Sequence, residues 1–261
     1  MALQTIEHDI LALVEGFNGK IAYKIENGSG DTIGLHKEES FQSASLIKIP
    51  MIIEGYRQSE RKKINLKQSV TIPPSVVAGG SGVLHTLSNK VSMTVEDLLT
   101  LMITVSDNTA TNMIMSLLGI DEVNQCIKEL GLKNTKLERR MQDFKALKEG
   151  RDNTISAEDT IICLKAIHTG DFLAKESQER IMRVFDNQQL KDKLPSLMGG
   201  GVKIASKTGG IRGVSHDCAI IRSESQTVYA AVLTENTRSE EDSRQVISKI
   251  GKLIYDGMMS K

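Results

Sequence analysis

The sequence predicts an α+β fold in which a five-stranded antiparallel sheet, flanked by terminal helices, carries an inserted all-helical domain. Strand-like patterns occur only near the two ends of the chain, at residues 20–36 and 202–233. The long stretch between them has mainly helical periodicity. The two ends must therefore build one α/β domain together, which we place at residues 1–42 and 196–261. The helical domain then spans residues 43–195, with a cleft between the two.

Each element of this fold follows from a local pattern. A 3.6-residue apolar period predicts helices, and runs rich in β-branched residues predict strands. Gly28-Ser29-Gly30-Asp31 is expected to turn a hairpin, and Ser156-Ala157-Glu158-Asp159 to open a helix as a capping box. In order, the predicted elements are a helix at Thr5–Phe17, strands at Lys20–Glu26 and Thr32–His36, a mainly helical region at Ser43–Gln188 broken by loops at Pro73-Pro74, Ala78–Gly82 and around Met141, strands at Val202–Lys207, Asp217–Arg222 and Thr227–Leu233, and a helix at Ser239–Met258.

Three short polar strings carry the chemistry: Ser45-Leu46-Ile47-Lys48, Ser106-Asp107-Asn108 and Lys207-Thr208-Gly209. Each is weak evidence alone. The Ser-x-x-Lys pattern, for example, recurs at Ser59–Lys62, inside a charged run typical of a solvated helix end. All three in this order predict a single site.

Ser45 and Lys48 have the spacing of a nucleophile and its base. A serine hydroxyl is a poor nucleophile until a base removes its proton, and a three-residue step places Lys48 on the same helical face. The pKa of Lys48 must then be lowered by burial and by a nearby positive charge, for which Lys207 is the candidate. The structural alternative is a buried helix with one serine and one snorkelling lysine.

The other two strings complete the predicted site. Ser106-Asp107-Asn108 forms a polar turn between two apolar helical stretches, where Asp107 or Asn108 can cap a helix while Ser106 relays a proton to the leaving group. Lys207-Thr208-Gly209-Gly210 closes a strand, and its glycines permit close approach of a substrate whose carboxylate Lys207 and Thr208 would hold. Alone, this string favours an ordinary strand followed by a Gly-Gly turn.

Taken together, the three motifs resemble those of the class A β-lactamases and, more loosely, the penicillin-binding DD-peptidases. The resemblance covers nearly the whole chain. It implies an acyl-enzyme at Ser45, Lys48 as the base and Ser106 as the proton relay. Substrate-binding residues implied by it are Asn108, Lys207, Thr208, Gly209, Gly210 and Arg212, with an oxyanion hole formed by the backbone amides of Ser45 and Gly210.

One loop departs from the family pattern. In class A β-lactamases a loop glutamate activates the water that hydrolyses the acyl-enzyme; here Met141 stands at that position and Lys145 replaces an asparagine. Arg139 and Asp152 still match the pair that closes the neck of this loop. The frame of the loop is kept, while its base is missing.

Two hypotheses follow from this departure. A register shift in the loop could bring Asp143 or Glu138 to the acyl group, and the protein would then be a hydrolase that turns over β-lactams or D-alanyl peptides or esters. Without such a shift, acylation would proceed and deacylation would be slow. The protein would then be a penicillin-binding sensor, or a DD-peptidase-like or esterase-like protein that is acylated without efficient β-lactam turnover.

Composition restricts the partners. The net charge is zero and the pI about 7.0, and the chain has no Trp, four Tyr and five Phe, so we expect no nucleic acid partner. The five histidines are scattered, which predicts no metal or cofactor, and His216-Asp217 is expected to be a structural pair. Cys126, Cys163 and Cys218 lie in apolar surroundings and read as buried free thiols. We expect a monomer acting on a small molecule.

The amino-terminal residues predict the cellular location only weakly. Acidic residues stand where a signal peptide would have its apolar core, and no 18-residue apolar span occurs. As written, the sequence predicts a cytoplasmic protein without a membrane span. The resembled families act mostly outside the cytoplasmic membrane, which this chain would reach if a leader had been removed.

Overall fold

The computed structural model describes residues 3–88, 90–237 and 239–260. Its main sheet is antiparallel with strand order β2-β1-β9-β8-β7, which confirms the predicted α+β class. The five strands are β1 (Lys20–Asn27), β2 (Thr32–Leu35), β7 (Lys203–Ile211), β8 (Val214–Arg222) and β9 (Thr227–Glu235). Strands from the two ends of the chain pair directly, because β1 lies beside β9.

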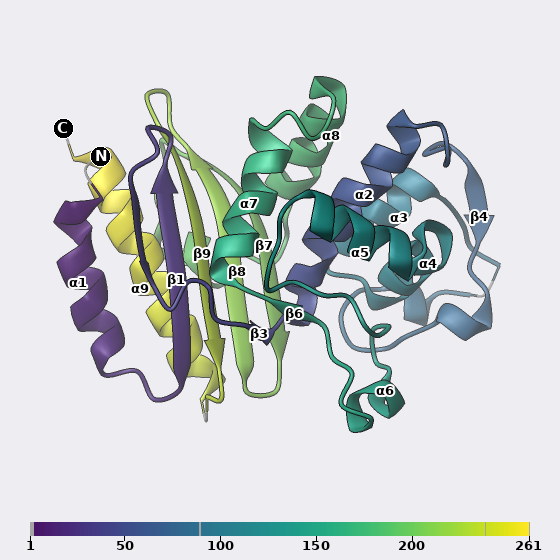
Figure 1. Ribbon diagram of the computed structural model, residues 1–261, viewed down its shortest axis with the longest axis horizontal. Coiled ribbons are helices and arrows are strands. Elements are labelled where there is room, and N and C mark those ends of the chain that lie inside the picture. Colours follow the sequence, from purple (N-terminus) through teal and green to yellow (C-terminus); the bar gives the residue numbers. More distant parts are fainter. Residues whose placement is uncertain (1–2, 89, 238, 261) are drawn as a thin grey trace.

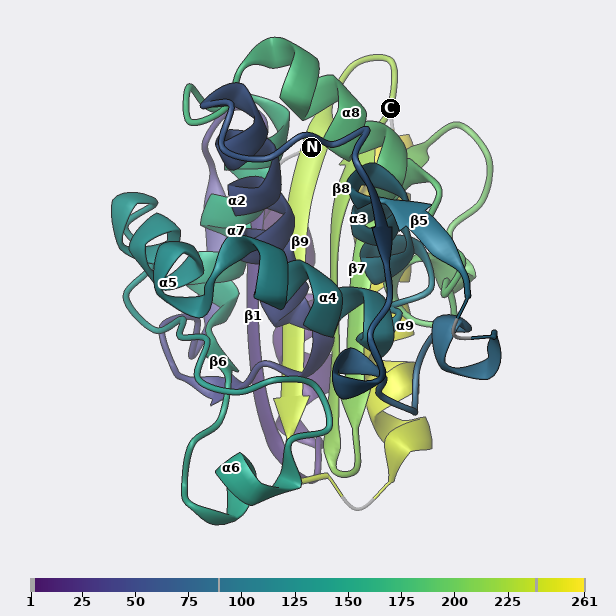
Figure 2. The ribbon, with the colours of Figure 1, turned by 90° about the vertical axis from the view of Figure 1, so that its right-hand side faces the viewer.

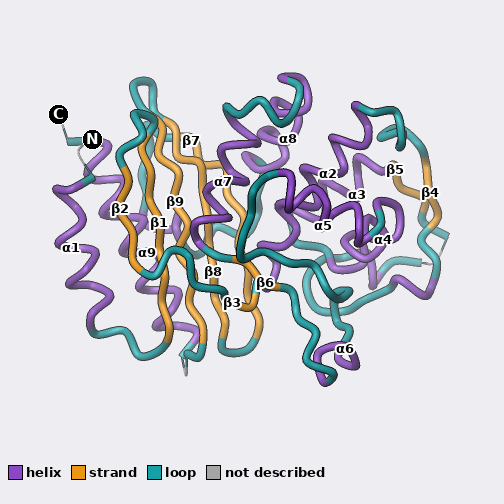
Figure 3. Tube along the Cα trace, viewed as in Figure 1, coloured by secondary structure: helices purple, strands orange, loops and turns teal. Residues whose placement is uncertain are grey.

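The sheet separates two apolar cores (Figures 1 and 3). One face packs against the terminal helices α1 (Gln4–Glu15) and α9 (Glu240–Met259), through residues such as Ile221. The opposite face packs against the helical part, through residues such as Ile220. Successive strand side chains point to opposite faces, so β8 is apolar on both sides.

The helical part surrounds one buried helix, α2 (Lys48–Glu60), whose residues 48–58 are all buried. A 3₁₀ turn, η1 (Ala44–Ile47), leads into it. The surrounding helices are α3 (Val95–Thr104), α4 (Asn108–Leu118), α5 (Ile120–Glu129), α6 (Phe144–Lys148), α7 (Ala157–His168) and α8 (Lys175–Asp186). Figure 2 shows this part from the front, with the loop that carries α6 projecting at its lower end.

Two small sheets lie inside the region predicted to be mainly helical. They are β3 (Phe41–Gln42) with β6 (Thr154–Ile155), and β4 (Ser69–Thr71) with β5 (Ser92–Thr94). Strands of two or three residues are too short to show a period in the sequence. The β3–β6 pair matters for the site, because it joins the end of the α6 loop to the chain just before η1.

Strand β7 is longer than predicted. The expected end at Lys207 is wrong, because β7 pairs with β8 residue by residue as far as Ile211 opposite Val214. The glycines therefore lie within the strand, and the turn is formed by Arg212 and Gly213, the latter with φ +77°. Glycine is uncommon in strands, so Gly209 and Gly210 interrupt the strand pattern of the sequence. The hydrogen bonding between β7 and β8 nevertheless continues past them.

Smaller predictions can also be compared with the structure. Ser156 caps α7 as predicted, its hydroxyl accepting from the Asp159 amide at 3.1 Å. The predicted capping box is incomplete, because the Asp159 carboxylate accepts from the amides of Lys133 and Asn134 and from the Thr135 hydroxyl. The three cysteines are buried and unpaired. Within the described residues, no helix is both long and apolar enough to cross a membrane.

Candidate active site

Ser45 lies on η1, where the chain is held from two sides. His216 Nε2 donates to the carbonyl of Gln42 at 2.7 Å, which ties the approach to Ser45 to the main sheet. The amide of Ser43 donates to the carbonyl of Asn153 at 2.8 Å, which ties it to the end of the α6 loop. The nucleophile candidate is thus positioned by both parts of the molecule.

Lys48 is fully buried at the first turn of α2. Its Nζ donates to the Ser106 carbonyl at 2.7 Å, to Ser106 Oγ at 3.1 Å and to Asn108 Oδ1 at 3.0 Å. Ser45 Oγ is not among these partners, so no direct hydrogen bond joins Lys48 to Ser45. Burial lowers the pKa of Lys48 well below its usual value; the charge of Lys207 lowers it further, and Asp107 opposes the shift.

Ser106 lies between the two lysines. Its Oγ is 3.1 Å from Lys48 Nζ and 3.0 Å from Lys207 Nζ. Its backbone has φ +56°, and that of Ala44, next to Ser45, has φ +44°. Residues other than glycine adopt this left-handed conformation at a cost, and such strain is typical of functional sites.

Asp107 holds the loop before α3 in place. Its fully buried carboxylate caps α4 by accepting from the amide of Ala110 at 2.9 Å, as one of the two predicted caps. It also accepts from the amides of Val83 at 2.6 Å and Leu84 at 2.8 Å. The glycine-rich loop just before these residues is held by Asn108, which bonds to the carbonyls of Gly79 and Ser81, and Ser81 lines both cavities described below.

The Lys-Thr-Gly strand passes directly beside Ser45. Burial lowers the pKa of Lys207 to about 7. A Cβ on Gly209 would lie 3.1 Å from the Ser45 amide nitrogen and 3.3 Å from the Ala44 Cβ. Glycine is therefore needed for this close approach. The approach places the backbone of β7 at Gly209 next to the Ser45 amide.

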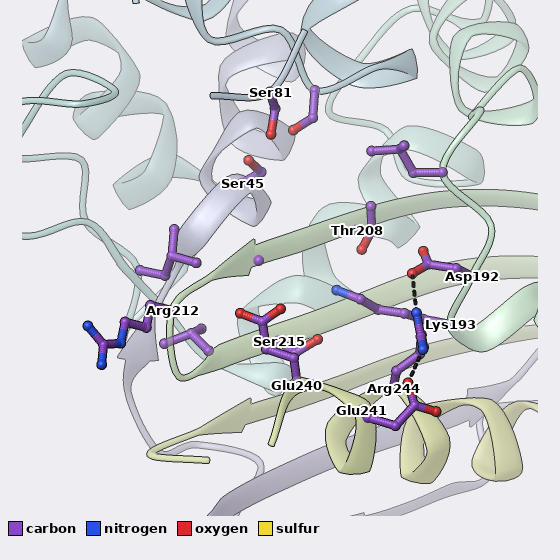
Figure 4. A pocket seen from close by; sticks show the side chains of 15 residues that line it. Ser45, Ser81, Asp192, Lys193, Thr208, Arg212, Ser215, Glu240, Glu241 and Arg244 are labelled. Carbon is purple, nitrogen blue, oxygen red and sulfur yellow. Dashed lines mark hydrogen bonds and ion pairs between the residues drawn. The ribbon is translucent and has the colours of Figure 1, made fainter. Parts of the chain in front are cut away.

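Two cavities meet at Ser45. The strand-side cavity, of about 590 Å³, is lined by residues that include Ser106, Thr208, Ser215 and Lys193. The loop-side cavity, of about 620 Å³, is lined by residues that include Asn108, Met141, Gln142, Phe144 and Ile211. In Figure 4, Ser45 and Ser81 face each other at the end of the strand-side cavity.

Met141 lines the loop-side cavity together with Ser45. Its backbone is fixed by Asn112, whose Oδ1 accepts from the Met141 amide at 2.8 Å and whose Nδ2 donates to the Met141 carbonyl at 3.2 Å. The predicted Arg139–Asp152 pair is confirmed, with Nε to Oδ1 at 2.7 Å. The loop is therefore closed at its neck, and Met141 lies in the cavity that Ser45 also lines.

The two alternative loop acids have other partners. Asp143 caps α6 by accepting from the Ala146 amide at 2.9 Å. Glu138 forms an ion pair with Lys136 at 2.5 Å. Neither is among the described residues that line the two cavities.

Arg212 stands on the exposed β7–β8 turn and lines both cavities. The predicted His216–Asp217 pair is wrong, because neighbouring residues of a strand point to opposite faces. His216 accepts from the amide of Thr234 at 3.2 Å, while Asp217 accepts from that of Leu194 at 3.0 Å.

Three residues of the site were missed in the sequence. Ser81 had a signal, since it is the polar side chain of a glycine-rich loop. Gln142 has φ +62° and lines the loop-side cavity; nothing in its sequence context indicated this. Lys193 follows two charged residues and resembled part of a solvated loop. Among the described residues, no group of His, Cys, Asp or Glu is arranged to hold a metal ion.

The fold, a five-stranded antiparallel sheet with helices on both faces, is that of the class A β-lactamases. The chain belongs to the Beta-lactamase enzyme family, whose model matches residues 5–258. It is similar to β-lactamase PSE-4 of Pseudomonas aeruginosa, at 26% identity over 97% of this chain and 90% of that protein. A β-lactamase structure from Sphaerobacter thermophilus superposes with a TM-score of 0.92, at 29% identity and full coverage of both chains. The structure of PBP-A superposes with a TM-score of 0.90, at 27% identity, covering 98% of this chain and 96% of that one.

Proposed function

We propose that β-lactams acylate Ser45 and that the acyl-enzyme is hydrolysed slowly. The observation that carries this proposal is the Ser106 hydroxyl, held between Lys48 Nζ at 3.1 Å and Lys207 Nζ at 3.0 Å in the cavity that Ser45 lines. This arrangement provides a base, a proton relay and a cation beside one serine. Family membership supports the same chemistry.

Acylation would begin when Ser45 Oγ attacks the lactam carbonyl and its proton passes to the neutral amine of Lys48. The amine has to turn from its present partners toward Ser45 for this step. The C–N bond of the lactam then breaks, and the leaving nitrogen takes a proton from Ser106, which recovers one from Lys48. The amides of Ser45 and Gly210 would stabilise the oxyanion.

Deacylation needs a base that can activate water, and the Met141 thioether cannot accept a proton at neutral pH. Asp143 and Glu138 are engaged elsewhere. A leucine-to-glutamate mutant of PBP-A, similar to this chain at 27% identity, has been solved as an acyl-enzyme complex with penicillin G. This supports a penicillin-binding protein, with D-alanyl peptides or esters as alternative acyl donors.

Intact-protein mass spectrometry after benzylpenicillin treatment, run beside a nitrocefin assay, tests the proposal. We expect a stable increase of one drug mass, absent in Ser45→Ala, with little steady nitrocefin hydrolysis. Rapid turnover would show that deacylation is efficient, and the absence of any adduct would refute acylation of Ser45.

A further inference from the structure

Lys193 is a buried lysine to which the acylation steps above assign no role. It lies directly before the 3₁₀ turn η4 (Leu194–Leu197), with 9% of its surface exposed. Its Nζ donates to the carbonyl of Gly209 at 2.7 Å and to that of His216 at 3.1 Å. Figure 4 shows the side chain extending over the strands that carry these carbonyls. The ammonium group therefore links β7 to β8 beside the strand-side cavity, which Lys193 also lines.

The position of Nζ fixes the orientation of one peptide group of β7. Because its two acceptors belong to adjacent strands, the Gly209 carbonyl points toward β8. The same peptide group contains the amide of Gly210, and in a trans peptide the N–H points away from the C=O. Since β7 is the edge strand of the sheet, the Gly210 N–H points away from β8, out of the free edge.

Ser45 lies beside this peptide group. A Cβ on Gly209 would stand 3.1 Å from the Ser45 amide nitrogen, and Gly210 lines both cavities together with Ser45. The Gly210 amide is also one of the two groups that would stabilise the oxyanion in the proposed acylation. Lys193 and the oxyanion would thus bind opposite ends of one peptide group.

The backbone of Lys193 is held by two other elements. The amide of Leu194 donates to Oδ2 of Asp217, a buried residue of β8, at 3.0 Å. The hydroxyl of Ser248 on α9 donates to the Lys193 carbonyl at 3.1 Å. The lysine side chain therefore starts from a fixed position, and its reach to β7 does not depend on a mobile loop.

The charge of Lys193 makes its contact with the Gly209 carbonyl stronger than an ordinary hydrogen bond. In the part of the chain that the structure describes, no carboxylate forms an ion pair with Nζ, and Asp217 attracts it only through space. A carbonyl that accepts such a bond polarises its peptide group, which makes the N–H at the other end a better donor. Fixed and polarised donors are what an oxyanion hole needs.

We propose that Lys193 is a positioning residue that orients and polarises the Gly209–Gly210 peptide group, so that the Gly210 amide can stabilise the oxyanion. The inference rests on the proposed acylation of Ser45 and deepens it by adding a residue outside the three motifs. Lys193 acts through the peptide group and does not touch the ligand. Its removal should therefore slow the bond-forming step and leave the binding of the ligand unchanged.

The test uses Lys193→Met, which has a similar length but no donor, together with Lys193→Arg and the control Lys191→Met. Lys191 is an exposed lysine two residues away that lines neither cavity. Stopped-flow acylation by benzylpenicillin separates the dissociation constant of the non-covalent complex from the first-order rate constant of acylation. Infrared difference spectra of the acyl-enzyme, with and without a heavy-isotope label in the lactam carbonyl, give the stretching frequency of the ester carbonyl in the oxyanion hole.

We expect Lys193→Met to lower the acylation rate constant about tenfold, because the Gly210 amide is kept but is no longer oriented and polarised. The dissociation constant should stay near that of the parent, and the ester carbonyl should absorb at a higher frequency. Lys193→Arg should recover part of both changes, and Lys191→Met should cause neither.

Slower acylation with an unchanged carbonyl frequency would show that Lys193 only supports the strands, and would overturn the inference. A loss seen with benzylpenicillin but not with its methyl ester would also overturn it, because the lysine would then act on the ligand itself. If Lys193→Met does not fold by circular dichroism, Lys193→Gln, whose shorter side chain is uncharged, takes its place under the same criteria. Absence of an adduct in the parent would instead refute the proposed function, on which the inference rests.

Discussion

At the scale of single residues, the protonation state of Lys48 decides whether Ser45 can be activated. Burial and the charge of Lys207 lower the pKa of Lys48, while Asp107 raises it. A lowered pKa leaves more neutral amine at pH 7, and the acylation rate should fall at acid pH, where Lys48 gains its proton. The low-pH limb of the acylation profile therefore reports this pKa.

Two substitutions should move that limb in opposite directions. Lys207→Met removes a positive charge, so the pKa of Lys48 rises and the limb moves to higher pH by about one unit or more. Asp107→Asn removes a negative charge and moves it to lower pH. Lys203→Met, at an exposed lysine of the same strand, should leave it in place. Shifts of the same sign in both variants would contradict this account; the measurement is the pH dependence of Ser45 acylation by benzylpenicillin.

A second residue-scale prediction concerns Met141. Met141→Glu places a carboxylate in the loop-side cavity next to Ser45, where it could activate water. We expect the acyl-enzyme to be hydrolysed about a hundredfold faster, measured as loss of the penicillin adduct after removal of free drug. Met141→Gln is the uncharged control and should not accelerate it. A glutamate variant no faster than the parent would show that another feature limits deacylation.

At the scale of elements, the loop that carries α6 is closed by the Arg139–Asp152 pair, whose side chains are only 14% and 16% exposed. Asp152→Asn should let this loop open locally while the main sheet stays folded. Phe144, which is 62% exposed on that loop, provides a chymotrypsin site. We expect roughly tenfold faster cleavage there, with little change in Tm.

Arg151→Gln is the matched control, because it breaks the exposed pair with Glu149 in the same loop. Exposed pairs contribute little, so its cleavage rate should stay near that of the parent. Equal rates in all three proteins would mean that the Asn112 contacts, and not the pair at the neck, hold the loop.

At the scale of the whole molecule, α9 has to lie close to η4 for the core beneath the sheet to close. A Cβ on Gly251 would stand 2.1 Å from the Leu194 carbonyl oxygen, which belongs to rigid backbone. Gly251→Ala should therefore destabilise the protein by about 3 kcal/mol, a fall in Tm of roughly 6–12 °C. Gly16→Ala, where a Cβ meets nothing within 4 Å, should be tolerated. An unchanged Tm in the first variant, measured by thermal unfolding, would contradict this packing.

The fold was predictable because its main signals are long. Strand patterns occur only near the two chain ends, with a helical region between them, so the five strands were expected to pair in one sheet. The observed strand order confirms this. The errors fall where signals are short or ambiguous. Strands β3 and β6 have two residues each, too few to show a period. Gly209 and Gly210 resembled a turn because the sequence does not show their pairing with β8.

The sequence by itself determined which chemical groups the protein has and in what order, including the three motifs and the methionine that replaces a loop base. Only the tertiary structure decided which of these groups lie in contact. Lys48 bonds to Ser106 across 58 positions and Lys207 to Ser106 across 101, and Lys193 enters the cleft from a loop that looked solvated. The physical reason is that contacts between distant segments depend on how whole layers pack, which no local pattern of residues specifies.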